Sequence, residues 1–89
     1  MSNRHTHILL IEDSPAYALL VNQLLSSATV PEFEVEHVDC LAVGLERLTR
    51  DGIDVVVTDL GLPDAQGLES VQAIVAQFPA LPVLVLTAV

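Results

Sequence analysis

The 89-residue chain lacks lysine, and few positive charges remain to bind anionic partners. Its three arginines are outnumbered by twelve acidic residues, which gives a formal net charge of −9. Because so acidic a surface repels phosphate backbones and anionic headgroups, we expect neither nucleic acid nor a membrane as a partner. The single cysteine, Cys40, excludes an internal disulfide and is typical of a reducing compartment, so we expect a cytoplasmic protein.

Aromatic residues are also scarce, at 3 % of a chain that is 52 % hydrophobic. The core must therefore be built from valine, leucine, isoleucine and alanine. No apolar run is long enough for a transmembrane helix. The length suits one small domain, which we place at residues 7–89, after a polar segment at 1–6 that we expect to be disordered.

Apolar runs alternate with helical patterns along the rest of the chain. Four runs predict strands at 7–11, 33–38, 55–59 and 83–87. Three stretches with apolar residues at helical spacing predict helices, the first beginning with Ser14 as N-cap and Pro15 at the first helical position. The second helix follows Asp39, which can serve as its N-cap, and the third covers about residues 67–77.

This order predicts an α/β fold, a doubly wound parallel sheet with helices on both faces. Strand 33–38 alternates apolar and polar residues, which is typical of an edge strand. Strand 83–87 is apolar throughout, and the sequence ends soon after it. Because a bare apolar edge invites pairing with another chain, we expect a homo-oligomer formed through this edge.

Acidic residues stand where two of the predicted strands end. Glu12 and Asp13 follow the first strand, and Asp59 closes the run Val55–Thr58. If these strands are neighbours, the three carboxylates meet at the edge of the sheet where α/β proteins bind ligands. Such a cluster is unfavourable unless a cation neutralises it or the pKa of one carboxyl rises, and among cations the oxygen ligands favour Mg²⁺. With the hydroxyl of Thr87, the set suits an aspartate nucleophile acting on a phosphoryl group.

Together these residues resemble the receiver domain of two-component response regulators. The resemblance rests on three motifs in order: Ile8–Ser14, Val55–Pro63 followed by Gly67-Leu68, and Val83–Ala88. It implies a flavodoxin-like sheet with strand order 2-1-3-4, from which the fifth strand and the last two helices of the family are missing. The sequence would then be a C-terminally truncated receiver.

The resemblance also implies a role for each site residue. Asp59 would accept a phosphoryl group from a sensor histidine kinase or a phosphotransfer protein, and an output domain outside this sequence would carry the response. Asp13, Asp59 and the backbone carbonyl of Gly61 would bind Mg²⁺, with Glu12 assisting through a water molecule. Thr87 would contact the phosphoryl group, and the small Ala88 would leave room for it.

One departure from the family affects the chemistry. Receivers carry a lysine at the end of a fifth strand, and this chain has none. With the metal as the only strong positive charge, we expect phosphorylation to be slow or absent. The alternative function is a receiver-like interaction module that dimerises without being phosphorylated; neither function is that of an enzyme acting on a separate substrate.

Several residues have plainer interpretations. Glu12 could be a solvated loop acid, and Asp64 is better explained as a loop or helix-capping residue than as a metal ligand. His37, on the edge strand, is expected to be solvated. A magnesium-dependent phosphatase would require a second aspartate two residues after Asp59, where this chain has Gly61.

Overall fold

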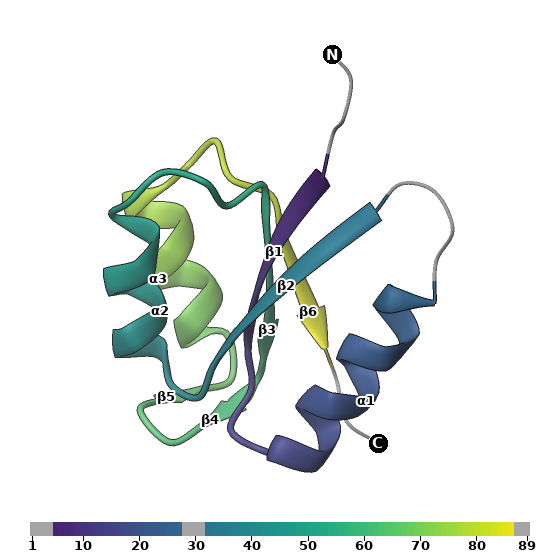
Figure 1. Cartoon of the computed structure of the whole chain (residues 1–89). Coiled ribbons are helices and arrows are strands. Elements are labelled where there is room, and N and C mark those ends of the chain that lie inside the picture. Colours follow the sequence, from purple (N-terminus) through teal and green to yellow (C-terminus); the bar gives the residue numbers. More distant parts are fainter. Residues whose placement is uncertain (1–4, 28–31, 87–89) are drawn as a thin grey trace.

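The computed structural model describes residues 5–27 and 32–86. Strands and helices alternate along the chain, as the sequence predicts (Figure 1). In chain order the elements are β1 His5–Ile11, α1 Pro15–Ser26, β2 Glu32–Val38, α2 Leu41–Leu48, β3 Val55–Asp59, β4 Gly61–Leu62, β5 Ala65–Gln66, α3 Glu69–Gln77 and β6 Val83–Leu86.

Four strands form one parallel sheet in the order β2-β1-β3-β6. This order confirms the predicted doubly wound topology, in which the chain first moves outward from β1 to β2 and then crosses back to β3. The register pairs Ile11 with Thr58 and Asp59 with Leu86, so the carboxyl ends of β1, β3 and β6 lie together. Strand β2 is an edge strand, as its alternating sequence predicted.

Helices cover both faces of the sheet. On one face, Ile8, Leu10 and Val57 pack with Ala18 of α1. On the other, α2 and α3 lie side by side (Figure 1) and pack on alternate residues of the same strands. The core there consists of Leu9, Ile11, Leu41, Leu48, Val56, Leu62, Ala65 and Ile74. Full burial of each leucine or isoleucine contributes about 1.5–3 kcal/mol, so these aliphatic residues account for much of the free energy that holds the sheet and helices together.

Helix α1 begins as predicted but presents its apolar residues differently. The hydroxyl oxygen of Ser14 accepts the backbone N–H of Tyr17 at 3.3 Å, and Pro15 begins the helix. Ala18 is buried, whereas Leu20 and Leu24, two of the apolar residues at helical spacing, are 49 % and 65 % exposed. Among the described helices, only α1 packs on this face of the sheet. Because no other described helix lies beside α1 on this face, part of the apolar surface of α1 meets solvent.

Two features differ from the sequence-based prediction: the start of β1 and a hairpin after β3. Strand β1 starts at His5, so the predicted terminal segment 1–6 contributes two residues to the sheet, and residues 1–4 lie outside the described part. After β3 the chain forms a short antiparallel hairpin, β4-β5, which pairs Gly61 with Gln66 and Leu62 with Ala65. Nothing in the sequence pattern predicted this hairpin, because each strand is two residues long.

The length and hydropathy of each described helix can be compared with what a transmembrane helix requires. Among residues 5–27 and 32–86, no helix is both long and apolar enough to cross a bilayer.

Candidate functional site

Three carboxylates converge at the carboxyl end of the sheet. Glu12 and Asp13 follow β1, Asp59 is the last residue of β3, and these two strands are neighbours. One oxygen from each of the three side chains lies within 4.8 Å of the others. The sequence-based expectation that two adjacent strands bring these acids together is therefore confirmed as geometry.

Glu12 is the buried member of this cluster. Its side chain is 2 % exposed, and its Oε2 accepts the backbone N–H of Ser14 at 3.0 Å. Its Oε1 is buried and has no hydrogen-bond partner among the described residues. Burial raises the pKa of Glu12, the charges of Asp59 and Asp13 raise it further, and the Ser14 amide opposes the rise.

The solvated-loop interpretation of Glu12 is therefore wrong. A buried carboxylate oxygen without a donor, facing two further carboxylates, is a group that lacks a positive partner. A hydrated hard cation supplies both charge and hydrogen-bond donors, so the donor set fits Mg²⁺.

Asp59 is half-buried and is held by the loop that follows it. Its Oδ1 accepts the backbone N–H of Leu60 at 2.9 Å. A Cβ atom placed on Gly61 would lie 3.8 Å from Asp59 Oδ2, which places the Gly61 backbone beside the carboxylate. Just before Asp59, the buried hydroxyl of Thr58 donates to Ser70 Oγ of α3 at 3.3 Å. The end of β3 is thus fixed from both sides.

Asp64 caps helix α2 from the other side of this loop. Its Oδ1 accepts the N–H of Leu41 at 2.8 Å, and its Oδ2 accepts the N–H of Ala42 at 2.9 Å. The prediction that Asp39 caps α2 is wrong: Cys40 is the N-cap residue, and its side chain makes no capping bond. The sequence carries no local signal for this cap, because Asp64 lies 23 residues after Leu41.

His37 is exposed, as predicted, but it also holds the backbone of Glu12, which was not predicted. Although the residue is exposed, its Nε2–H donates to the backbone oxygen of Glu12 at 2.7 Å. The backbone N–H of Glu12 in turn donates to the carbonyl of Val38 at 3.0 Å. The end of β2 therefore fixes the backbone of Glu12, and neither residue spacing nor composition indicated this contact.

Two of the predicted site residues, Thr87 and Ala88, lie outside the described residues. Strand β6 is described to Leu86, which pairs with Asp59 in the sheet.

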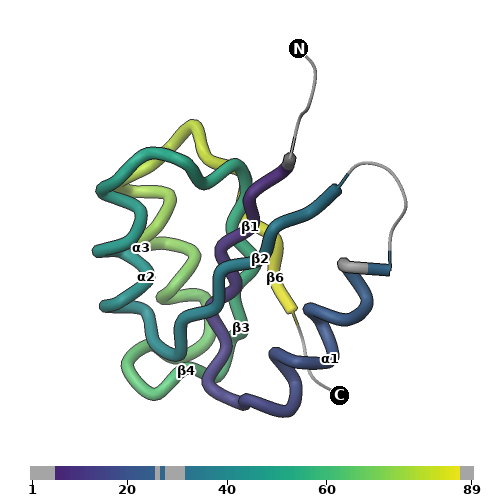
Figure 2. Tube along the Cα trace, viewed as in Figure 1, coloured from purple at the N-terminus to yellow at the C-terminus, as the bar shows by residue number. Residues whose placement is uncertain are grey.

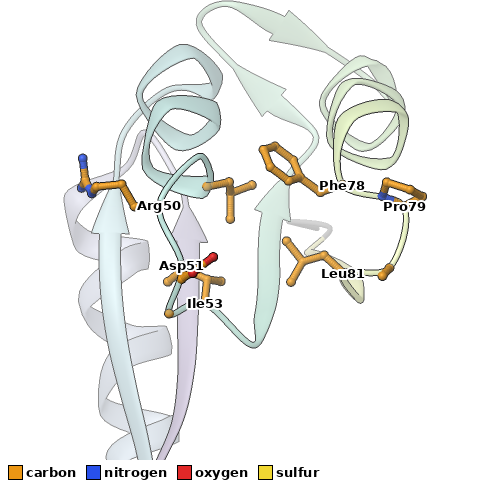
Figure 3. Close-up of a pocket in the computed structure, with 9 residues that line it drawn as sticks. Arg50, Asp51, Ile53, Phe78, Pro79 and Leu81 are labelled. Atoms are coloured by element: carbon orange, nitrogen blue, oxygen red, sulfur yellow. The ribbon is translucent and has the colours of Figure 1, made fainter.

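A cavity of 350 Å³ lies at the opposite end of the sheet from the acidic cluster. It is formed by the loops that precede β3 and β6, and Figure 3 shows Ile53, Phe78 and Leu81 around it. Its lining is mostly apolar and contains none of the three clustered carboxylates. The cavity therefore takes no part in the chemistry of the acidic cluster.

Comparison with known proteins agrees with this geometry. The family profile described as the response regulator receiver domain matches residues 8–89. The transcriptional regulatory protein GlrR of Escherichia coli K12 is 32 % identical over 88 residues, which are 99 % of this chain and 19 % of GlrR. The chain thus spans about a fifth of the length of that relative.

Solved structures share the fold. A sensor protein from Polaromonas sp. JS666 has a TM-score of 0.82 and 29 % identity, over 93 % of this chain and 66 % of the other. The phosphorylated cyanobacterial phytochrome response regulator RcpA has a TM-score of 0.81 and 29 % identity, over 97 % of this chain and 67 % of the other.

Proposed function

The chain belongs to the response regulator receiver family, and we propose that it acts there as a phosphoacceptor in two-component signalling. Asp59 accepts a phosphoryl group from the phosphohistidine of a sensor kinase or a phosphotransfer protein. One observation carries this proposal: the carboxylate of Asp59 lies within 4.8 Å of those of Glu12 and Asp13, and one oxygen of Glu12 is buried without a partner.

Asp59 is the nucleophile in this proposal. The Leu60 amide holds its Oδ1, so its Oδ2 attacks the phosphorus atom. A bond forms between this oxygen and phosphorus while the bond between phosphorus and the histidine nitrogen breaks. The leaving nitrogen keeps the electron pair and takes up a proton, and the phosphoryl group ends as an acyl phosphate on Asp59.

Three further groups complete the metal site: Asp13, the Gly61 carbonyl and Glu12. Asp13, Asp59 and the Gly61 carbonyl would hold Mg²⁺, and the buried Oε1 of Glu12 would accept a hydrogen bond from a water molecule on the metal. When bound, Mg²⁺ neutralises charge on the acids and on the transferred phosphoryl oxygens. Thr87 contacts the phosphoryl group and Ala88 leaves space for it.

Without lysine, this chain lacks one positive charge that the transition state uses elsewhere in the family, so transfer in the 89-residue chain is slow. The protein works in the cytoplasm and modifies only itself. Its signal passes to an output domain outside this sequence.

Phosphoryl incorporation tests the proposal directly. We expect slow, sub-stoichiometric incorporation from radiolabelled acetyl phosphate that requires Mg²⁺ and disappears in Asp59→Asn. Asp54→Asn is the matched control, because Asp54 immediately precedes the amino end of the same strand, where it accepts the His7 amide. Label that persists in Asp59→Asn excludes Asp59 as the acceptor, and rapid stoichiometric incorporation refutes the role given to the missing lysine.

A second function, association with another copy, is favoured by the distribution of charge. Although the chain carries a net charge of −9, residues 14–27 and 70–86 contain no Asp, Glu, Lys or Arg. These segments include α1 and the edge strand β6. Leu84 of β6 is 59 % exposed and pairs in register with Val57, so it lies on the face of the sheet that α1 covers.

We therefore infer that two copies meet through a charge-free surface, by which we mean the exposed Leu84 of β6 and the exposed Leu20 and Leu24 of α1. Docking through any of the acidic surfaces would bring like charges together, whereas this surface buries apolar side chains without that cost.

A further inference from the structure

The amino end of α2 depends on a residue from a distant loop. The first backbone N–H groups of a helix have no partner within the helix, and a side chain at the N-cap usually accepts one of them. Here Cys40 makes no such bond, and both carboxylate oxygens of Asp64 accept from Leu41 and Ala42, at 2.8 and 2.9 Å. The cap therefore joins two segments that are separated by β3.

The loop that carries Asp64 is the one that carries Gly61. Asp64 lies at the turn of the β4-β5 hairpin, in which Gly61 pairs with Gln66. The base of the loop is closed by the N–H of Gly67, which donates to the Leu60 carbonyl at 2.9 Å. Figure 2 shows the loop passing beside the start of α2.

Packing reinforces the same contact. Leu62 and Ala65, on either side of the turn, are 0 % and 4 % exposed, and they belong to the same core cluster as Leu41. A hairpin that is paired internally and anchored by two buried side chains moves as a unit. The hairpin thus connects Asp64 to the Gly61 backbone, which lies beside Asp59.

The loop that carries Glu12 is held by residues next to the start of α2. His37 and Val38, at the end of β2, bond to the backbone oxygen and nitrogen of Glu12. Residues 37–42, which we call the β2–α2 corner, thus contact both the loop of Glu12 and the loop of Gly61. The β2–α2 corner thus sets the position of the Glu12 loop relative to the Gly61 loop, although the corner itself contributes no metal ligand.

We propose that Asp64 is a positioning residue: by fastening the 60–67 loop to the β2–α2 corner, it sets the Gly61 carbonyl at the distance from Asp59 and Asp13 that Mg²⁺ requires. This inference rests on the proposed function, because it assumes that Mg²⁺ binds at the three carboxylates. Asp64 does not touch the metal; it acts through the backbone of its own hairpin.

The test compares Mg²⁺ affinity in the wild-type chain, Asp64→Ala, Asp64→Asn and Thr49→Ala by calorimetric titration. Thr49 caps the opposite end of α2, where its hydroxyl donates to the Glu46 carbonyl at 2.6 Å, so its loss weakens the same helix away from the site. We expect Asp64→Ala to weaken Mg²⁺ binding about tenfold, as replacement of residues that orient ligands commonly does. Asp64→Asn keeps one acceptor oxygen and recovers part of the affinity, and Thr49→Ala leaves it unchanged.

A second readout needs no metal. In the metal-free protein, amide hydrogen exchange at Gly67 is expected to accelerate in Asp64→Ala and not in Thr49→Ala, because only the first releases the hairpin. Equal Mg²⁺ affinity in Asp64→Ala and the wild type, or equal losses in Asp64→Ala and Thr49→Ala, would overturn the positioning role. A wild-type chain that binds no Mg²⁺ overturns the proposed function and this role with it; in that case faster exchange at Gly67 still shows that Asp64 fastens the loop.

Discussion

Asp13 and Asp59 leave neighbouring strands and bring carboxylate oxygens within 4.8 Å of each other, beside the buried Glu12. Charges of one sign at this separation repel, and the repulsion is larger where water is partly excluded. The folded chain therefore holds a site whose energy falls when a cation enters.

Mg²⁺ is expected to stabilise the fold through this site. At a free concentration ten times its dissociation constant, binding to the folded state alone adds about 1.4 kcal/mol to the free energy of unfolding. Asp13→Asn removes a ligand and should reduce this gain, which urea unfolding followed by circular dichroism would measure. Asp51→Asn, an equal change of charge in the loop after α2, should keep it. Equal gains in both variants would mean that Mg²⁺ only screens the net charge.

Glu12 should give the metal-free protein a pH dependence of a definite sign. Burial raises its folded pKa above the ordinary value of 4.5, so between these two values the folded state holds more protons than the unfolded state. The stability of the fold therefore decreases as the pH rises through this interval. Glu12→Gln should be more stable than the wild type at neutral pH without Mg²⁺, and the difference should vanish below pH 4.5.

Glu46→Gln, which makes the same substitution on the exposed side of α2, is the control for Glu12→Gln. A Glu12→Gln variant less stable than the wild type at neutral pH would show that the carboxylate is better satisfied than its contacts suggest.

The stability that Asp64 contributes should depend on pH in the opposite direction, decreasing as the pH falls. The amides of Leu41 and Ala42 lower its pKa below the ordinary value of 3.8, so its contribution is complete above that pH and is lost as the pH falls through the lower, folded value. At neutral pH we expect Asp64→Ala to cost about 1 kcal/mol, a typical figure for loss of an N-cap. Chemical unfolding at neutral and acid pH measures the difference, which should shrink in acid; a constant difference would contradict capping by the ionised carboxylate.

Association is expected to depend on the charge-free surface. Leu84→Lys places a charge on the β6 edge, where the side chain is 59 % exposed, so the fold should survive while self-association weakens. Leu68→Lys is the matched control, because Leu68 is 57 % exposed at the start of α3, which packs on the opposite face of the sheet from α1. Sedimentation equilibrium gives the mass of each variant, and a monomeric wild type at high concentration would refute the dimer.

Much of the fold could be predicted because it depends on local patterns. The apolar runs gave β1, β3 and β6, and the Ser14-Pro15 pair gave the start of α1. The β4-β5 hairpin could not be predicted, because two-residue strands have no periodicity. The exposure of Leu20 and Leu24 also escaped prediction, since helical spacing shows that a helix has an apolar face and not how much of that face is covered.

The sequence by itself determined which residues end the strands, and therefore that Glu12, Asp13 and Asp59 stand at carboxyl ends of a parallel sheet. Only the tertiary structure decided that Glu12 is buried with an unpartnered oxygen, that Asp64 rather than Asp39 caps α2, and that His37 holds the Glu12 backbone. The physical reason is that strand ends follow from side-chain pattern along the chain, whereas capping and desolvation depend on which distant segments pack together.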